Sequence, residues 1–160
     1  METKIENKSA LFEDVVSETE KIIARAGRRD KTLLAVCQLL AERIPYYNWV
    51  GFYLVDAQND RELVLGPYVG DPTDHTRIGF GQGICGQAAD REETFVIQDV
   101  SKESNYLSCS INVKSEIVVP IFKEGRVIGE LDIDSHKLSP FNDDDRRYLE
   151  KICEMISGLF

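Results

Sequence analysis

The stretch SEIVVPIFKEGRVIGELDID, residues 115–134, decides the fold. It holds two runs rich in Val and Ile, residues 115–122 and 126–133, separated by a short polar segment that ends at Gly125. Runs of β-branched residues joined by a turn with glycine are typical of an antiparallel hairpin. The sequence therefore predicts two neighbouring antiparallel strands here.

Three acids lie within these apolar strands: Glu116, Asp132 and Asp134. Asp132 and Asp134 share one face because strand side chains alternate. A two-residue turn would set Glu116 opposite Ile133, whereas a three-residue loop with Gly125 at positive φ sets it opposite Asp132. We prefer the three-residue loop, because it gathers three carboxylates at one end of the sheet. The alternative is that these acids are solvated strand ends.

Outward from the hairpin, hydrophobic periodicity and turn residues predict helices at both ends of the chain and short strands between them. The expected elements are helices over 11–26 and 30–44, strands over 49–55, 63–65 and 77–78, a short helix from 84 or 85, a strand over 95–97 and a helix over 142–160. We expect Asp30 and Asn142 as N-caps and Gly27 as a helix stop. The polar segment 99–112 reads as a functional loop. This order favours an α+β architecture, an antiparallel sheet flanked by helices.

Length and charge limit the class of protein. The 160 residues suit one domain, and the net charge of −9 argues against partners such as nucleic acid or an anionic membrane surface. The longest apolar run, residues 117–122, is too short to cross a bilayer, and residues 1–8 have no export signal. We therefore expect a cytoplasmic protein whose four cysteines are thiols at rest.

The cysteines fall into two groups. Cys85 follows a glycine-rich turn at a predicted helix start, where the helix dipole favours thiolate. Cys109 lies in the polar loop, so that a reactive and an inert role are both open. Cys37 and Cys153 belong to amphipathic helices and are expected to serve packing alone.

Two other motifs carry little weight. Residues 81–86 match G-x-G-x-x-G, but the residues before them are too polar for the buried parallel strand of a dinucleotide site, so we interpret the glycines as a turn. A metal site built from His75, Cys85, Cys109 and the carboxylates lacks the usual ligand spacing, and we expect no metal and no other cofactor.

Four separated segments in this order resemble a GAF domain, and more narrowly the free methionine-(R)-sulfoxide reductases. They are residues 49–53 (WVGFY), 79–86 (GFGQGICG), 115–120 (SEIVVP) and 129–135 (GELDIDS). The resemblance implies a GAF fold with a central antiparallel sheet of about six strands. It divides one domain, residues 1–160, into N-terminal helices over 10–44, a sheet and ligand pocket over 48–135 and a C-terminal helix over 142–160.

The resemblance also implies roles for single residues. Cys109 matches the attacking cysteine and Cys85 a second one, whereas His75 stands where these reductases usually carry the resolving thiol. A Cys109 thiolate would attack the sulfoxide sulfur while an acid among Glu116, Asp132 and Asp134 donates a proton.

The other acids of this group would bind the substrate ammonium, with His75 beside them in the pocket. Trp49 would give an apolar wall. Cys85 would then form a disulfide with Cys109.

The implied partners are free methionine sulfoxide or a similar amino-acid-like ligand, a thioredoxin-like reductant and a second copy of the chain in a homodimer. The alternative is a GAF sensor module that binds a small molecule without turnover.

Overall fold

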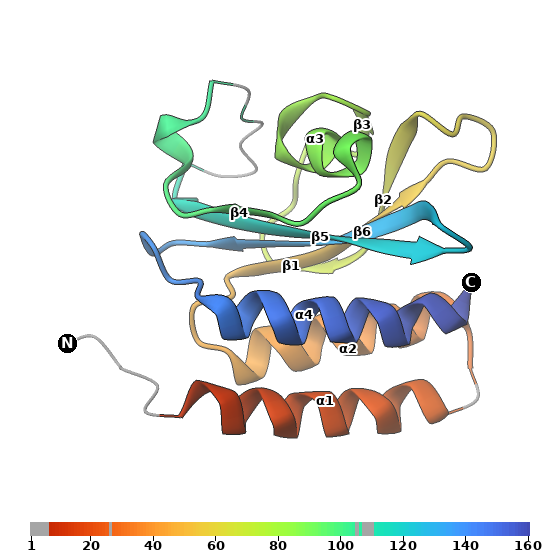
Figure 1. Ribbon diagram of the computed structural model, residues 1–160, viewed down its shortest axis with the longest axis vertical. Helices are drawn as coiled ribbons and strands as arrows, with labels where there is room; N and C mark the ends of the chain where they lie inside the picture. The colour runs from red at the N-terminus through yellow and green to blue at the C-terminus, as the bar shows by residue number, and fades with distance from the viewer. Residues whose placement is uncertain (1–6, 26, 105, 107–110) are drawn as a thin grey trace.

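The computed structural model describes residues 7–25, 27–104, 106 and 111–160 (Figure 1). Within this part of the chain the helices are α1 (Lys8–Ala24), α2 (Arg29–Arg43), α3 (Gly83–Arg91) and α4 (Asp143–Ile156), with 3-10 turns η1 (Val100–Lys102) and η2 (Ser157–Leu159). The strands are β1 (Trp49–Val55), β2 (Glu62–Val69), β3 (Arg77–Gly79), β4 (Phe95–Ile97), β5 (Ser115–Lys123) and β6 (Arg126–Ser135).

The six strands of the described residues form one antiparallel sheet in the order β3-β2-β1-β6-β5-β4. Figure 1 shows α2 and α4 against one face of this sheet, α1 outside them as a further layer, and α3 on the opposite face. This arrangement confirms the predicted α+β class and its central antiparallel sheet of six strands. It also leaves the α3 face of the sheet for a small second core.

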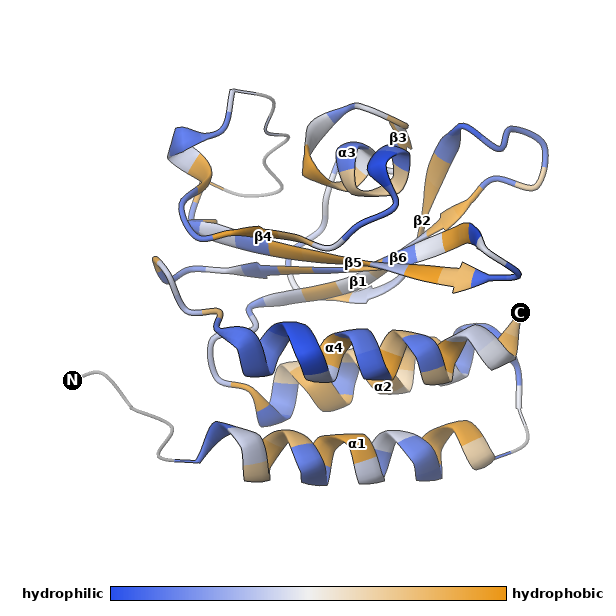
Figure 2. Cartoon of the chain, in the orientation of Figure 1, coloured by the Kyte–Doolittle hydropathy of each residue, from blue (hydrophilic) through white to orange (hydrophobic). Residues whose placement is uncertain are grey.

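The main core lies between the sheet and helices α1, α2 and α4. Every second residue of β5 and β6 points into it, among them Ile117, Val119, Leu131 and Ile133, all less than 2% exposed. Figure 2 shows apolar residues along these strands and hydrophilic residues along the side of α4 that faces the viewer. Burial of these side chains is the main favourable contribution to folding, at about 1.5–3 kcal/mol for each fully buried Val, Leu or Ile.

Two helix boundaries differ from the prediction. Helix α1 ends at Ala24 because Arg25 is extended, with ψ 128°, so Gly27 is not its immediate stop. The N-cap of α2 is Arg28 and not Asp30, which lies in the first turn, where its charge complements the helix dipole. Asn142 is confirmed as an N-cap, since its side chain accepts two backbone N–H groups at the start of α4.

Strand β2 is longer than predicted, since it continues through Pro67 to Val69. Proline lacks the N–H that a ladder needs, so the sequence indicated a loop. Strand β3 pairs with β2 only over residues 62–64, and Pro67 therefore lies where β2 has a free edge on that side. A strand edge tolerates proline.

The turn between β5 and β6 is the two-residue alternative, and the preferred three-residue loop is wrong. Lys123 pairs with Arg126, and the two residues between them, Glu124 and Gly125, have φ of 51° and 76°. Positive φ at both positions is the signature of a type I′ hairpin turn. The expected positive φ of Gly125 is confirmed.

A bulge then shifts the register of the two strands by one residue. Phe122 pairs with Val127, but Ile121 pairs with Gly129, so the strand β6 carries one extra residue. As a result Glu116 lies opposite Asp134 rather than Ile133 or Asp132. Cross-strand partners share a face, so the three acids point the same way although the predicted pairing was wrong.

The polar segment 99–112 contains the 3-10 turn η1 and no strand within its described residues. Residues 105 and 107–110 lie outside the described part of the chain, and Cys109 is among them. No helix that the structure describes is long and apolar enough to cross a membrane.

Candidate functional site

The site lies on the α3 face of the sheet. The acids of β5 and β6 point to this face because side chains alternate along a strand. Glu116, Asp132 and Asp134 are each 5% exposed or less. The interpretation of these acids as solvated strand ends is therefore wrong. Burial of several carboxylates is costly unless they find protons, partners or a ligand.

Helix α3 places Cys85 directly above these acids. The turn before it needs glycine, because Gly81 and Gly83 have φ of 90° and 61°. Gly86 packs so closely that a Cβ there would lie 2.4 Å from the carbonyl oxygen of Gly79. The glycines of the G-x-G-x-x-G match therefore serve to seat α3 on β3, an antiparallel edge strand, which agrees with the turn interpretation.

The expected thiolate at Cys85 is wrong. Burial raises the pKa of this thiol well above its ordinary value, and the negative charges of Asp132, Glu130, Glu116 and Asp134 raise it further. The position in the first turn of α3 cannot offset both effects, because a helix dipole acts as only about half a charge. Both effects favour the neutral thiol over the thiolate at Cys85.

Glu130 is a fourth acid on the same face, and the sequence analysis did not single it out. It is fully buried, and its two carboxylate oxygens have no hydrogen-bond partner in the described part of the chain. Alternation along β6 could have found it, since Glu130, Asp132 and Asp134 are two residues apart.

The two central acids hold their protons more tightly than free carboxyl groups. Burial raises the pKa of Glu130 well above its ordinary value, the charge of Asp132 adds to the rise, and the Cys85 thiol opposes it. Burial also raises the pKa of Asp132, against the opposing effects of Glu116 and Cys85. A buried acid that keeps its proton near neutral pH is a candidate proton donor.

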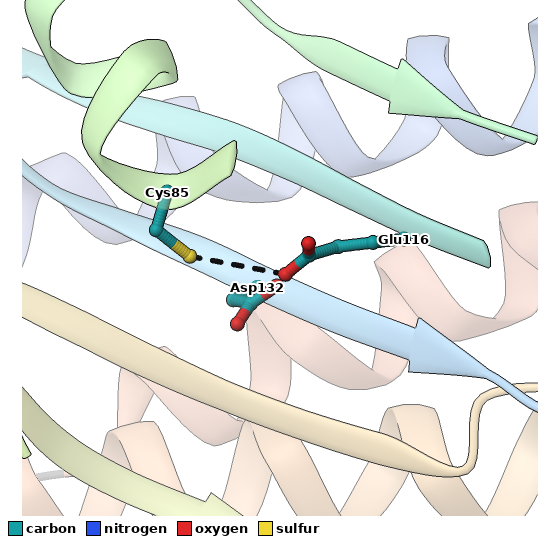
Figure 3. A group of neighbouring side chains, drawn as sticks. All are labelled: Cys85, Glu116 and Asp132. Carbon is teal, nitrogen blue, oxygen red and sulfur yellow. Dashed lines mark hydrogen bonds between the residues drawn. The ribbon is translucent and has the colours of Figure 1, made fainter. Parts of the chain in front are cut away.

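Three ligand-type atoms meet at the centre of the site (Figure 3). The Cys85 thiol lies 3.9 Å from Glu116 Oε2, and these atoms and an Asp132 oxygen are all within 4.8 Å of one another. The three residues come from α3, β5 and β6, so no local spacing motif could have indicated this group. The sequence expectation of no metal site relied on such spacing.

A small cavity opens beside this group. It measures about 10 Å³ and is lined by Tyr53, His75, Ile78, Gln82, Gly83, Ile84, Cys85, Glu116 and Asp132. The backbone carbonyl of His75 accepts a hydrogen bond from the Tyr53 hydroxyl at 2.8 Å, which joins β1 to the segment before β3. A cavity of this size holds about one water molecule.

Trp49 lies one strand away on the same face. It pairs across β1 and β6 with Asp134, stacks on Tyr68 at 5.3 Å between ring centroids, and donates its indole N–H to the carbonyl of Asp71 at 3.0 Å. Its ring covers Gly51, where a Cβ would lie 2.5 Å from the indole. Trp49 is therefore held rigidly at the margin of the acid cluster.

The remaining cysteines separate as follows. Cys37 and Cys153 are buried in the main core, on the other side of the sheet from Cys85, and burial raises the pKa of both thiols. Cys109 lies outside the described residues, so its predicted place at the site stays a prediction.

Fold and site together define a small α+β domain with a buried, carboxylate-lined pocket on one face of its sheet. The GAF domain model matches residues 27–158. GAF domain-containing protein A of Dictyostelium discoideum is 39% identical over 152 residues, which cover 95% of this chain and 94% of that protein. The free methionine-R-sulfoxide reductase of Escherichia coli is 35% identical over 150 residues, with 94% and 88% covered.

A solved structure of free methionine-R-sulfoxide reductase from Neisseria meningitidis, in complex with its substrate, is also similar. It is 38% identical and aligns with a TM-score of 0.91 over 100% of this chain and 94% of its own. The chain therefore belongs to the GAF domain family, among relatives that include free methionine-R-sulfoxide reductases. The resemblance seen in the four sequence segments is confirmed.

Proposed function

We propose that this protein reduces free methionine-(R)-sulfoxide to methionine at the expense of a thiol. One observation carries the proposal: a buried thiol faces four buried carboxylates in a chain that aligns, over its whole length, with a reductase solved with its substrate. Carboxylates suit the ammonium group of a free amino acid, and a protonated acid suits the departing sulfoxide oxygen.

Cys109 is the proposed nucleophile. Its thiolate attacks the sulfoxide sulfur, the oxygen takes a proton, and the S–O bond breaks with oxygen transferred to the cysteine. The products are methionine, reduced by two electrons, and a Cys109 sulfenic acid. Glu130 and Asp132 are the proposed proton donors because burial raises the pKa of both.

The other pocket residues would bind the substrate. We assign Glu116 and Asp134 to the substrate ammonium and Trp49 to the S-methyl group, with His75 at the pocket wall. A methionine sulfoxide is much larger than the cavity of about 10 Å³, so binding requires side chains around the cavity to move.

Cys85 is the proposed resolving thiol, since His75 stands where the resemblance implies the usual one. Its sulfur attacks the sulfenic sulfur, a disulfide forms, and the thiol proton leaves with the hydroxyl as water. Because the pKa of Cys85 is raised, the proton must leave during the attack rather than before it. A thioredoxin-like dithiol would then reduce the disulfide, which fits a cytoplasmic setting.

Peroxide or substrate should therefore produce one intramolecular Cys85–Cys109 disulfide. Mass spectrometry of unreduced peptides would detect it, and Cys37 and Cys153 serve as internal controls that stay free. A persistent Cys109 sulfenic acid, or intermolecular disulfides alone, would contradict the assigned pair.

The function itself is tested by turnover of free methionine-(R)-sulfoxide with dithiothreitol and, separately, with thioredoxin. We expect turnover that Cys109→Ser abolishes, while Cys85→Ala lowers mainly the thioredoxin-dependent rate. Binding of the sulfoxide without turnover under either condition would replace this proposal with a GAF sensor module.

We also propose that residues 1–160 act as one domain and pair as a homodimer. The support for one domain is that α2 and α4 pack on a single sheet and α1 packs outside them as a further layer (Figure 1). Coincident unfolding transitions by fluorescence and circular dichroism would test the first proposal, and sedimentation the second.

A further inference from the structure

The group of Cys85, Glu116 and Asp132 has the composition and the spacing of a metal site. In tetrahedral zinc coordination the Zn–S distance is about 2.3 Å and the Zn–O distance about 2.0–2.2 Å, so the ligand atoms lie about 3.3–3.8 Å apart. Here the three ligand atoms are within 4.8 Å of one another, and the thiol is 3.9 Å from Glu116 Oε2. A small adjustment of the three side chains would bring these atoms to the distances that a bound ion requires.

A second observation points to a missing partner. Glu130 is fully buried, and both its carboxyl oxygens lack a hydrogen-bond partner in the described chain. One oxygen of Asp132 also has no partner there. Buried native acids are normally hydrogen-bonded, paired or bound to a metal, so an unpartnered acid beside a ready ligand group is the signature of an absent cation.

The ligand set selects the kind of cation. A sulfur ligand disfavours Mg²⁺ and Ca²⁺, which take oxygen, and favours Zn²⁺ and similar divalent transition ions. The cavity beside the group, about 10 Å³, has room for a single ion or water. One thiolate and two carboxylates carry three negative charges, so their complex with Zn²⁺ would have a net charge of −1.

We propose that Cys85, Glu116 and Asp132 form a three-ligand site for a divalent transition ion such as Zn²⁺, with the fourth position open to the cavity. Binding forms one S–Zn and two O–Zn bonds and breaks the Cys85 S–H bond. The thiol proton and the proton that Asp132 holds leave to solvent, and no atom changes its oxidation state. Glu130 lies beside the three ligands as an uncoordinated acid. The site needs neither Cys109 nor a sulfoxide, but it uses three residues that the proposed reduction also uses, so a bound ion and the substrate would compete for them.

Calorimetric titration of the reduced full-length protein with Zn²⁺ tests the site. We expect one equivalent to bind, and Cys85→Ala, Glu116→Gln and Asp132→Asn each to weaken binding at least tenfold. Cys37→Ala and Cys153→Ala are matched controls, since both remove a buried thiol from the main core on the other side of the sheet, and they should bind as the parent does. Circular dichroism of each variant checks its fold.

Cobalt gives a direct readout of the sulfur ligand. Co²⁺ in the same site should show a thiolate-to-metal charge-transfer band that Cys85→Ala removes and Cys109→Ser keeps. Absence of stoichiometric binding, or binding and a band that survive in a folded Cys85→Ala variant, would overturn the proposal. Neither measurement uses sulfoxide turnover, so both results test the metal site alone and not the proposed reductase activity.

Discussion

Glu130 shows how one residue can bind protons more tightly in the folded protein than in the unfolded chain. Its pKa in an unfolded chain is about 4.3, and burial raises its pKa well above that value in the native state. Between these two pKa values the native protein holds more protons than the unfolded chain. The contribution of Glu130 to stability is therefore fully present below about pH 4.3 and is lost as the pH rises through the native pKa.

We predict that Glu130→Gln becomes progressively more stable relative to the parent as the pH rises from 5 to 8. The amide cannot ionise, so only the parent carries this pH dependence. Removing an unpartnered buried acid should be worth about 1–3 kcal/mol at the upper end, or about 2–4 °C in Tm for each kcal/mol. Urea denaturation at several pH values measures it.

The exposed Glu154→Gln is the control for this comparison, since it lies on the outer side of α4. It should track the parent across the range. A constant difference between Glu130→Gln and the parent would show that Glu130 titrates normally in the folded protein.

The cysteines illustrate why burial alone does not identify a reactive thiol. Cys37, Cys85 and Cys153 are all buried with raised pKa. Their hydrogen-bond contacts differ, because the thiols of Cys37 and Cys153 contact the backbone carbonyls of Pro67 and Val119, whereas the thiol of Cys85 contacts the Glu116 carboxylate.

We predict that the double variant Cys37→Ala/Cys153→Ala keeps the kcat/KM of the parent for methionine sulfoxide. It should unfold at lower urea concentration, at a cost of about 1–3 kcal/mol from two small core cavities. Loss of most activity in a double variant with normal circular dichroism would show that the reactive thiols are wrongly assigned.

Among the elements, the β5–β6 hairpin shows which features local sequence patterns can predict. They predict which side chains share a face, but not the pairing of the two strands. Alternation correctly places Asp132 and Asp134 on one face, because it depends only on strand geometry. The pairing of Glu116 depends on the turn and on an extra residue in β6, and the run of similar apolar residues does not mark where the bulge falls.

Similarly, the dipole argument for Cys85 used only its own helix. Acids on two distant strands, together with burial, decide its protonation instead. Sequence patterns thus predicted the six-stranded sheet and most helices, while the electrostatics of the site arise from tertiary packing.

The geometry of this turn predicts opposite changes in stability for two substitutions. Glu124 has φ 51°, which costs strain for most residues but little for Asn, and Asn-Gly is the preferred type I′ pair. Glu124→Asn should therefore stabilise the protein by roughly 0.5–1 kcal/mol. Gly125→Ala should destabilise it by about 1 kcal/mol through backbone strain alone, since no atom lies within 4 Å of the added Cβ.

Urea denaturation of both variants provides the comparison. Because the two expected changes in stability have opposite signs, a general effect of altering the turn cannot explain both. Stabilisation by Gly125→Ala would contradict the left-handed geometry of this turn.

At the scale of the whole molecule, the sheet separates the main apolar core from the candidate functional site. Its α2–α4 face carries the large apolar core, whereas its α3 face carries a smaller core interrupted by four buried acids. Because stability is marginal, a cluster of acids that costs free energy needs such a core on the other side of the same strands.

Asp145 joins three distant parts of that stable side. Its buried carboxylate accepts hydrogen bonds from the hydroxyls of Tyr46 and Tyr47, each at 2.7 Å, and forms an ion pair with Lys8 of α1. It also accepts the backbone N–H of Asn142 at 2.9 Å. Asp145 therefore does more than interact favourably with the dipole of α4.

We predict that Asp145→Ala lowers the free energy of unfolding by about 3–5 kcal/mol, because it leaves the Lys8 charge and two tyrosine hydroxyls without their common acceptor. Asp143→Ala, exposed in the same first turn of α4, should cost less than about 1 kcal/mol, which isolates the buried network from the dipole effect. Urea denaturation monitored by tyrosine fluorescence and by circular dichroism measures both. Equal costs for the two variants would mean that Asp145 acts only as a helix-capping acid, and that α1 is held by apolar packing alone.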